Sequence, residues 1–338
     1  MPATFDLPLS ELYAYTGTNP RPADFDAFWD RGLSEVADLG TDYQEKPAAI
    51  QTPFARCGHL TFQGVGDARI HARLARPRKT ESPGPGLLSF HGLGSSAADW
   101  VEMLPYAAMG FTVAAMDCRG QGGRSEDPGG VRGTTLRGHI VRGLDDAPDR
   151  LLYRQIFLDA AQLARIVMAM PEVDPDRVAT TGWSQGGALA LACAALEPRI
   201  FRTAPVYPYL CDYLRVYDID LARDAYGELQ EWFRYNDPLH GREMEIFERL
   251  GYIDIQHLCP RIQGEVFMAT GLMDEICPPS TQFAAYNRIT APKSLALYSD
   301  FAHEDLPGHP DRIFRFLTEG LVEGAVFRGP WEKTVYPL

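Results

Sequence analysis

Hydrophobic and polar positions follow two patterns along most of the chain: short apolar runs, and longer segments with one apolar face. Short runs of the kind that form buried strands lie at residues 60–62, 70–74, 87–90, 111–116, 177–181, 203–207, 266–270 and 294–298. Apolar side chains recur at helical spacing in residues 153–170, 188–196, 281–289 and 311–319. Alternating strands and helices predict crossover connections and a mainly parallel sheet covered by helices on both faces. The pattern therefore favours one α/β domain over residues 1–338.

Three segments stand outside this alternation. The N-terminal extension, residues 1–50, carries an amphipathic helix over 22–36. Residues 122–149 are polar and rich in glycine, and residues 209–261 are helical in pattern and rich in Tyr, Trp and Phe. An insertion as long as the last one, placed between two core strands, is typical of a lid, a pocket wall or an oligomer contact.

The charge balance excludes one class of function. The 338 residues hold 32 Lys and Arg against 45 Asp and Glu, a formal net charge of −13. Nucleic acids and anionic membrane surfaces recruit clusters of Lys and Arg and repel a negative body, so neither is expected as a partner. The N-terminal residues have no basic segment followed by an apolar run, which predicts no secretory signal.

The sequence also predicts neither a membrane span nor a disulfide framework. The longest uncharged window, residues 178–196, is interrupted by Thr, Ser, Gln and Gly, which a lipid-buried helix tolerates poorly. The cysteines lack a C-x-x-C pair and are dispersed at positions 57, 118, 193, 211, 259 and 277. This usage is typical of reduced, mostly buried thiols, so we expect a cytoplasmic protein.

The sharpest motif is G-x-S-x-G at residues 182–186, between the strand pattern at 177–181 and the helix that follows. A serine hydroxyl is a poor nucleophile and needs both geometry and a base. A strand-turn-helix elbow pushes the serine side chain out at the carboxyl end of the sheet, and the flanking glycines leave room for that strained turn. The motif therefore predicts Ser184 as a nucleophile.

An elbow serine is followed in chain order by an acid and then a histidine. His303 lies in a loop just after the last strand pattern, where a base is expected. Asp274 follows the preceding strand pattern, which makes it the candidate acid, with Glu275 as the fallback. His309, between a glycine and a proline at the start of the last helix, is expected to be a capping or surface residue.

These residues predict acyl transfer. Ser184 attacks a carbonyl, His303 takes its proton and later returns it to the leaving group, and Asp274 holds the imidazole tautomer. The oxygen that gains negative charge would face two backbone N–H groups. We expect these from Gln185, at the helix N-terminus, and from Leu93, in the loop after the strand at 87–90.

Other chemistry finds less support in the sequence. His303-Glu304 is followed by His309 only six residues on, and the intervening proline and glycine break any zinc-protease helix. The glycine-rich stretch 120–123 lacks the Lys-Ser/Thr of a phosphate loop and the acid of a dinucleotide site. We therefore expect no metal and no organic cofactor. His91, which precedes a glycine at a strand end, is expected to pack or hydrogen-bond locally.

Three short signatures occur in order along the chain: Arg119-Gly120-Gln121, Gly182-x-Ser184-Gln185-Gly186 and His303-Glu304. With them the chain resembles carbohydrate esterase family seven, the acetyl xylan esterases and cephalosporin C deacetylases of the α/β-hydrolase fold. Further stretches that look like family sequence cover nearly the whole chain, at residues 5–9, 153–154, 207–210, 271–280 and 283–287.

The resemblance implies a mainly parallel sheet flanked by helices, with an N-terminal helical extension and a helical insertion before the acid-bearing strand. It implies three groups of site residues: the triad Ser184, Asp274 and His303, the backbone oxyanion donors Leu93 and Gln185, and the structural supports Arg119, Gln121 and Glu304. It also implies hydrolysis of acetyl esters on short xylo-oligosaccharides and on cephalosporin C. The protein would then be a ring-shaped homohexamer in the cytoplasm that needs no cofactor or metal.

Two features depart from the family. Tyrosine is frequent in the family where Leu93 stands. A backbone donor survives that change but the pocket wall does not, so the acyl preference stays open. Residues 122–149 also diverge in composition, where oligomer contacts are expected. Separately, Arg119 follows a core strand and would be buried only with a carboxylate partner, for which Glu304 is the candidate.

The α/β-hydrolase fold also supports functions other than deacetylation. A broad short-chain carboxylesterase would use the same triad, and a peptidase of this fold usually carries a large extra domain for which this chain has no room. A non-catalytic small-ligand receptor would be expected to have lost a triad residue, whereas Ser184, Asp274 and His303 are all present. The leading hypothesis is a serine esterase that deacetylates small substrates.

Overall fold

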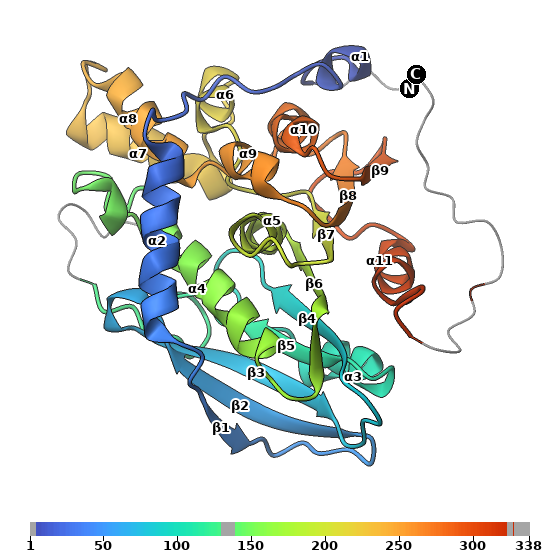
Figure 1. The fold of residues 1–338 in the computed structure, drawn as a ribbon. Coiled ribbons are helices and arrows are strands. Elements are labelled where there is room, and N and C mark those ends of the chain that lie inside the picture. The colour runs from blue at the N-terminus through green and yellow to red at the C-terminus, as the bar shows by residue number, and fades with distance from the viewer. Residues whose placement is uncertain (1–4, 130–138, 323–326, 328–338) are drawn as a thin grey trace.

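The structure is a computed structural model that describes residues 5–129, 139–322 and 327. Within these residues the strands form a nine-stranded sheet in the order β1-β2-β3-β5-β4-β6-β7-β8-β9 (Figure 1). The strands are β1 (Gln44–Pro47), β2 (Ala55–Gln63), β3 (Arg69–Pro77), β4 (Gly84–Phe90), β5 (Thr112–Met116), β6 (Val173–Trp183), β7 (Arg202–Val206), β8 (Glu265–Gly271) and β9 (Lys293–Tyr298).

Parallel pairing dominates the part of the sheet that carries the candidate chemistry. Strands β5, β4, β6, β7, β8 and β9 pair in parallel in that order. The N-terminal strands β1, β2 and β3 extend the sheet with antiparallel pairs, the last of them to β5. The predicted mainly parallel sheet is thus confirmed. Because parallel strands end at the same edge, the segments that follow β4, β6, β8 and β9 meet there.

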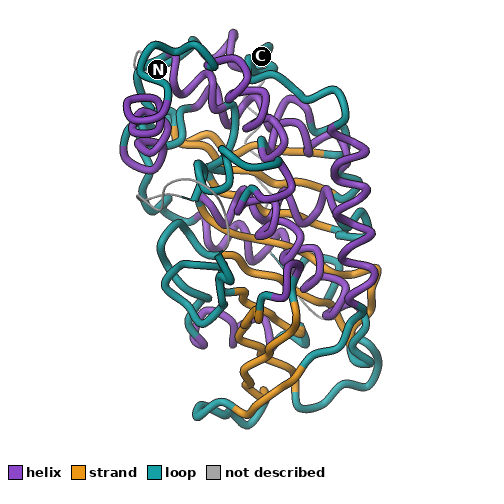
Figure 2. Tube along the Cα trace, turned by 90° about the vertical axis from the view of Figure 1, so that its left-hand side faces the viewer, coloured by secondary structure: helices purple, strands orange, loops and turns teal. Residues whose placement is uncertain are grey.

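Helices cover both faces of the sheet (Figures 1 and 2). The helices are α1 (Leu9–Leu12), α2 (Phe25–Leu39), α3 (Trp100–Ala108), α4 (Leu152–Met168), α5 (Gln185–Leu196), α6 (Tyr213–Asp218), α7 (Gly227–Asn236), α8 (Glu243–Leu250), α9 (Ile255–Leu258), α10 (Pro279–Arg288) and α11 (His309–Thr318). Short 3₁₀ turns lie at Val65–Asp67, Pro148–Arg150, Asp224–Tyr226, Gly251–Ile253 and Cys259–Arg261.

Two apolar clusters form the core, one on each face of the sheet. The larger cluster includes the buried faces of α2, α4 and α5, and the smaller one includes those of α3 and α11. Every residue of α5 is buried, which fits its sequence of Ala, Leu, Gly and Cys. Small side chains let this helix lie close to the sheet: a Cβ at Gly187 would come within 2.8 Å of the Val206 carbonyl oxygen. All six cysteines are buried, as predicted.

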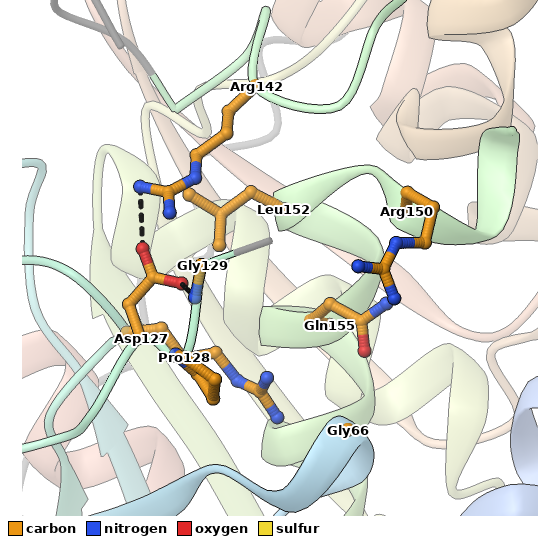
Figure 3. Close-up of a pocket in the computed structure, with 9 residues that line it drawn as sticks. Gly66, Asp127, Pro128, Gly129, Arg142, Arg150, Leu152 and Gln155 are labelled. Carbon is orange, nitrogen blue, oxygen red and sulfur yellow. Dashed lines mark hydrogen bonds and ion pairs between the residues drawn. The ribbon is translucent and has the colours of Figure 1, made fainter. Parts of the chain in front are cut away.

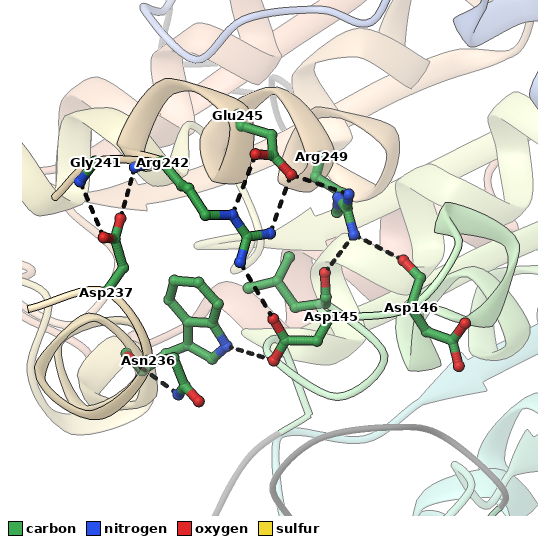
Figure 4. A network of polar contacts seen from close by, with 10 residues as sticks. Asp145, Asp146, Asn236, Asp237, Gly241, Arg242, Glu245 and Arg249 are labelled. Carbon is green, nitrogen blue, oxygen red and sulfur yellow. Dashed lines mark hydrogen bonds and ion pairs between the residues drawn. The ribbon is translucent and has the colours of Figure 1, made fainter.

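The helical insertion at residues 209–261 contains α6 to α9 and holds a neighbouring turn, as Figure 4 shows. Arg249 Nη1 donates 2.8 Å hydrogen bonds to the carbonyls of Leu144 and Asp146. Arg249 Nη2 also donates to Glu245 at 3.1 Å, which keeps the guanidinium aligned with that turn. The insertion is therefore packed on the segment that leads into α4.

Glu228 of α7 makes a second attachment to the same segment. Its carboxylate accepts the backbone N–H groups of His139, Ile140 and Val141 at 3.0 to 3.2 Å. Burial raises the pKa of Glu228 to about 7. Residues 130–138 of the predicted insertion at 122–149 lie outside the described residues. The described residues of 122–147 contain no helix or strand.

The N-terminal extension also packs on the helical insertion. The buried carboxylate of Asp212 accepts hydrogen bonds from Tyr15 Oη at 2.7 Å and from the backbone N–H of Asn19 at 2.8 Å. Trp29, on the predicted amphipathic helix, donates from Nε1 to the Tyr252 carbonyl at 3.1 Å.

In the described part of the chain, no helix combines the length and the apolar character needed to cross a membrane.

Three elements are absent from the sequence-based prediction. Helix α1 has only four residues, too few to show a helical period. Strand β1 is exposed at every position, so it has no hydrophobic alternation to detect. Helix α3 contains Pro105, and its start is marked by the capping box of Asp99 and Glu102.

Candidate active site

Ser184 stands at the sharp turn between β6 and α5. Its backbone has φ 56° and ψ −118°, in the left-handed half of conformational space that side-chain-bearing residues avoid. Its N–H donates to the Val206 carbonyl at 3.0 Å, and its carbonyl accepts from Ala188 N–H at 3.0 Å. The neighbouring strand and the helix thus hold the strained turn, which has the geometry of a nucleophile elbow.

Crowding at this turn explains the two flanking glycines. A Cβ at Gly186 would lie 2.0 Å from the Phe90 carbonyl oxygen, and a Cβ at Gly182 would lie 2.4 Å from the Gly186 backbone. No side chain fits at either distance. The glycines therefore let β4, β6 and α5 meet directly beneath Ser184.

Asp274 and His303 form a hydrogen-bonded pair at the ends of β8 and β9. Asp274 is fully buried, whereas the side chain of His303 is 20% exposed. His303 Nδ1 lies 2.8 Å from Asp274 Oδ2. A carboxylate on Nδ1 favours the imidazole tautomer whose Nε2 can accept a proton. The chain order used in the sequence analysis thus brings the expected acid and base together.

The turn after β8 orients Asp274. Its Oδ1 accepts the backbone N–H groups of Ile276 at 2.9 Å and of Cys277 at 2.8 Å. Gln282, one turn into α10, donates from Nε2 to Oδ2 at 3.3 Å. These contacts fix the carboxylate plane so that Oδ2 faces His303.

Cys277 lies beside this pair and interacts with the nucleophile. Its Sγ, a carboxylate oxygen of Asp274 and a ring nitrogen of His303 all lie within 4.8 Å of one another. Burial and the charge of Asp274 raise the pKa of the Cys277 thiol, and a side-chain hydrogen bond with Ser184 acts in the opposite direction. The three predicted triad residues are therefore gathered around one thiol.

Tyr207 is a site residue that the sequence analysis does not single out. It follows β7 directly, next to the Val206 carbonyl that holds Ser184. Its ring centroid lies 4.4 Å from that of His303, and its hydroxyl donates to the Glu304 carbonyl at 3.1 Å. Its position at a buried strand end, beside the elbow strand, is the signal that could have revealed it.

Side-chain amides join the two segments that carry the candidate oxyanion donors, the start of α5 and the loop after β4. Gln185 is the first residue of α5 and is fully buried, while Leu93 is exposed in the loop after β4. The amides of Gln121 and Gln185 pair at 2.8 and 3.1 Å, and Gln121 Oε1 also accepts the N–H of Gly94 at 2.8 Å. Tyr153 Oη donates to Gln185 Oε1 at 2.8 Å. Gln121 therefore connects the elbow with the Leu93 loop.

Arg119 is buried and paired with a carboxylate, as predicted, but the carboxylate belongs to Asp159. The prediction of Glu304 as the partner is wrong. Arg119 donates to Asp159 from Nε at 2.5 Å and from Nη2 at 2.7 Å, and to the Val65 carbonyl at 2.6 Å. Glu304 is exposed and accepts the N–H of Ala302 at 3.0 Å. Asp159 lies on α4, and its proximity to Arg119 comes from helix packing that chain order does not reveal.

Two other residues from the sequence analysis, Glu275 and His91, take no part in the Asp274–His303 pair. Glu275, the fallback acid, is exposed and lies 3.2 Å from Arg223. His91 bonds locally, as expected: Nδ1 lies 2.7 Å from the Gly92 carbonyl oxygen, and Nε2 accepts Cys118 N–H at 3.0 Å.

His309 begins α11, but it is fully buried and its side chain makes no capping hydrogen bond, so its prediction as a capping or surface residue is wrong. Within the described residues neither of its ring nitrogens has a hydrogen-bond partner, and burial lowers its pKa to about 3. Its ring lies 5.4 Å from Phe267 and 6.1 Å from Trp183, centroid to centroid, so it serves as part of the apolar packing.

A cavity of about 1030 Å³ adjoins these loops between α3 and α11. Its lining includes His91, Gly92, Trp183, Leu306 and Phe314. Gly182 and Trp183 of the elbow strand line the cavity, but Ser184, Asp274 and His303 do not. The cavity therefore lies beside the elbow strand and not around the candidate triad.

Figure 3 shows a second, much smaller cavity, of about 70 Å³. Arg142 and Asp127 face each other across its rim in an ion pair of 2.6 Å, and Arg119 also lines it. Like the larger cavity, it is lined by none of the three candidate triad residues. Its size suits water rather than an organic substrate.

Comparison with known proteins gives a match over nearly the whole chain. A family model described as acetyl xylan esterase matches residues 1–320. The crystal structure of acetyl xylan esterase 1 from Thermoanaerobacterium sp. JW/SL YS485 is 54% identical, with a TM-score of 0.91 over 93% of this chain and 98% of that one. Acetyl xylan esterase from Paenibacillus sp. R4 is 35% identical, with a TM-score of 0.87 over 92% and 99%.

A curated relative points the same way. Acetyl esterase Axe7A of Xylanibacter ruminicola is 27% identical over 278 residues, which are 80% of this chain. The chain spans 61% of that relative's length. The parallel sheet, its flanking helices and the solved structures of similar proteins give the α/β-hydrolase fold, as expected from the sequence.

Proposed function

The chain belongs to the acetyl xylan esterase family, and we propose that it is a serine esterase that removes acetyl groups from small acetylated sugars. One observation carries the proposal: His303 Nδ1 lies 2.8 Å from the buried Asp274 carboxylate, and Cys277 beside this pair has a side-chain hydrogen bond with the strained Ser184. A serine at an elbow, with a base oriented by a carboxylate, is the arrangement that activates a hydroxyl for acyl transfer.

In the first step, Ser184 Oγ attacks the acetyl carbonyl carbon while His303 Nε2 takes the hydroxyl proton. Asp274 accepts the hydrogen bond from Nδ1 and stabilises the imidazolium that forms. As the tetrahedral intermediate collapses, the proton moves from His303 to the sugar oxygen, which leaves as an alcohol. The acetyl group is then held as an ester of Ser184.

In the second step, water attacks this ester, again with His303 as the base, and acetate leaves. The negative charge on the carbonyl oxygen in both steps would face the N–H groups of Gln185 and Leu93, with the N-terminus of α5 behind the first. Gln121 supports this arrangement because its amide contacts both the elbow and the loop of Leu93.

Hydrolysis of an aryl acetate, compared with an aryl octanoate, tests the proposal. We expect rapid acetate turnover, slow octanoate turnover and no turnover by Ser184→Ala. Preference for octanoate would favour a broader carboxylesterase, and the absence of turnover by folded wild-type protein would favour a receptor. Either result would contradict the deacetylase.

The finer substrate assignment rests on the family resemblance. We propose acetylated xylo-oligosaccharides as substrates, with cephalosporin C as a second acetyl ester. Parallel assays of acetate release from both will rank them. Release from neither, with aryl acetate still cleaved, would leave a small-ester hydrolase of another specificity.

The assembly and the compartment are proposed on the same ground: a homohexamer in the cytoplasm. Light scattering coupled to size-exclusion chromatography measures the number of subunits, and fractionation of the source cells identifies the compartment. A monomer in solution would refute the hexamer but would leave the proposed triad unaffected.

A further inference from the structure

Three side chains of different ligand chemistry converge at the candidate active site. Asp274 offers a carboxylate oxygen, Cys277 a sulfur and His303 a ring nitrogen, all within 4.8 Å of one another. Among the residues that the structure describes, this is the only group of three histidine, cysteine or acidic side chains that lie this close. Asp274 and Cys277 are fully buried, and His303 reaches the surface with 20% of its side chain.

The backbone holds two of these donors in place. Asp274 Oδ1 accepts the N–H of Cys277 at 2.8 Å, so the carboxylate and the thiol belong to one closed turn. His303 is then held against the other oxygen at 2.8 Å. The carboxylate and the thiol are therefore oriented before any ligand arrives, which lowers the cost of binding.

Ser184 adds a fourth donor. Its side chain hydrogen-bonds with Cys277, so its hydroxyl is within reach of a cation bound to that sulfur. Sulfur, nitrogen and two oxygens around one point form the mixed donor set that Zn²⁺ and Cd²⁺ accept in tetrahedral sites. In such a site, zinc–ligand bonds of 2.0 to 2.3 Å place neighbouring ligand atoms about 3.3–3.7 Å apart. The contact between His303 Nδ1 and Asp274 Oδ2, at 2.8 Å, is shorter than this, so the loop of His303 must shift by roughly 1 Å and give up that hydrogen bond as the cation enters.

We propose that Asp274, Cys277 and His303 bind a thiophilic divalent cation of the Zn²⁺ and Cd²⁺ class, with Ser184 on the fourth side, and that the bound cation reversibly stops turnover. Binding displaces the thiol proton to solvent, because the ligand is the thiolate. The cation takes the imidazole lone pair and the hydroxyl that acyl transfer requires. Binding stands independently of the proposed function, whereas the loss of turnover rests on it.

Titration of the full chain with Cd²⁺, in buffer free of chelators, tests binding directly. We expect an ultraviolet thiolate-to-cadmium charge-transfer band that saturates at about one cadmium per chain. The band should vanish in Cys277→Ala and Cys277→Ser, both checked for native melting. It should persist in the matched control Cys211→Ala, another buried cysteine. A band that survives in both Cys277 variants, or no band in the wild type, would overturn the site.

Ser184→Ala separates this result from the proposed function. That variant keeps the three ligands, so its cadmium band should remain even though turnover is lost. If the wild-type protein hydrolyses no ester, the proposed function fails while the cadmium titration still decides the site. A band lost in Ser184→Ala as well as in Cys277→Ala would contradict the three-residue site.

The effect on turnover is measured with Zn²⁺ and an aryl acetate. We expect inhibition that a chelator reverses. If Cys277→Ser retains turnover, the zinc concentration that halves it should be at least about tenfold higher than for the wild type. His59→Gln is the control, because His59 Nδ1 and His71 Nε2 face each other at 3.0 Å elsewhere in the molecule. Zinc sensitivity that is lost in His59→Gln and kept in Cys277→Ser would place the cation at that histidine pair and overturn the proposal.

Discussion

Two clusters in this protein contain the same three residue types, and they differ in how their polar atoms are used. The clusters are the candidate triad, Ser184, His303 and Asp274, and a second trio, Ser125, His71 and Asp117. In both, the aspartate follows the carboxyl end of a central strand, β8 or β5. In both, an imidazole nitrogen lies close to the carboxylate, at 2.8 Å in the triad and 2.6 Å in the second trio.

In the second trio, the serine hydroxyl makes hydrogen bonds to backbone groups. Ser125 Oγ donates to the Asp117 carbonyl at 2.6 Å and accepts the N–H of His71 at 2.9 Å. The other ring nitrogen of His71 faces His59 at 3.0 Å, and His71 is 4% exposed. The hydroxyl is thus engaged with the backbone, and the ring is closed off from solvent.

The triad has a different setting. Ser184 sits on a strained turn between β6 and α5, and the side chain of His303 is 20% exposed. The histidine–aspartate contact is therefore not what distinguishes a reactive group. The distinction lies in whether the serine hydroxyl and the second imidazole nitrogen can face a substrate.

The largest expected effect separates the two serines. Ser184→Ala should lower turnover of aryl acetate by at least about 10⁴-fold, because the nucleophile is lost. Ser125→Ala should leave the turnover of folded protein within about threefold and lower the unfolding free energy by about 1 kcal/mol, through the loss of hydrogen bonds to the backbone. Steady-state kinetics and urea unfolding measure both, and equal kinetic losses would abolish the comparison.

Next in size is the contrast between the aspartates. Asp274→Asn should reduce kcat by about 10⁴-fold, since an amide favours the wrong imidazole tautomer. Asp117→Asn should act on stability instead, with kcat of the folded protein within about tenfold of the wild type. Kinetics on samples matched for circular dichroism make the comparison. A kcat loss in Asp117→Asn as large as that in Asp274→Asn would show that the second trio takes part in the reaction.

Acid unfolding sharpens the role of Asp117. Burial alone raises its pKa, but hydrogen bonds from His71 and from the N–H groups of Ala97 and Arg124 outweigh burial and hold the pKa at about 2. This lies below the ordinary value of 3.8, so the folded state favours the charged form. The stabilisation, about 2 kcal/mol, is complete above about pH 4 and is lost as the pH falls towards 2.

Urea unfolding of the wild type and of Asp117→Asn at a series of pH values checks this. The difference in unfolding free energy between the two proteins should shrink as the pH falls from about 4 to about 2. A difference that stays constant over that window would contradict the depressed pKa of Asp117.

The smallest effect concerns the loop that follows Asp117. Arg119→Lys keeps the charge but loses the two-pronged contact with Asp159, so we expect a loss of about 1 kcal/mol in unfolding free energy. Arg234→Lys, on the exposed face of α7, is the matched control and should change nothing measurable. Equal melting of all three proteins would show that the guanidinium fork is dispensable.

Much of the site could be predicted because its signals are local. The elbow motif fixes Ser184 through its glycines, whose crowding against Phe90 no other residue could relieve. Asp274 and His303 follow from their places after successive strands, since parallel strands end at one edge. The fold class was accessible for the same reason, because each core strand carries its own apolar run.

The remaining features depend on contacts between distant segments. Asp159 reaches Arg119 only because α4 packs beside the sheet, and nothing near either residue encodes that pairing. His309 was expected at the surface because a glycine and a proline flank it, yet burial against Phe267 and Trp183 decides its environment. Ser125, His71 and Asp117 come from three separate segments and were not linked by any motif.

The tight junction under Ser184 also shapes how this protein could change its substrate. With a carbonyl oxygen 2.0 Å from where any Cβ at position 186 would sit, the elbow has no tolerated variants there. Diversity must enter instead through rim positions such as Leu93, which is exposed in the loop after β4. A directed-evolution library is therefore best confined to the rim.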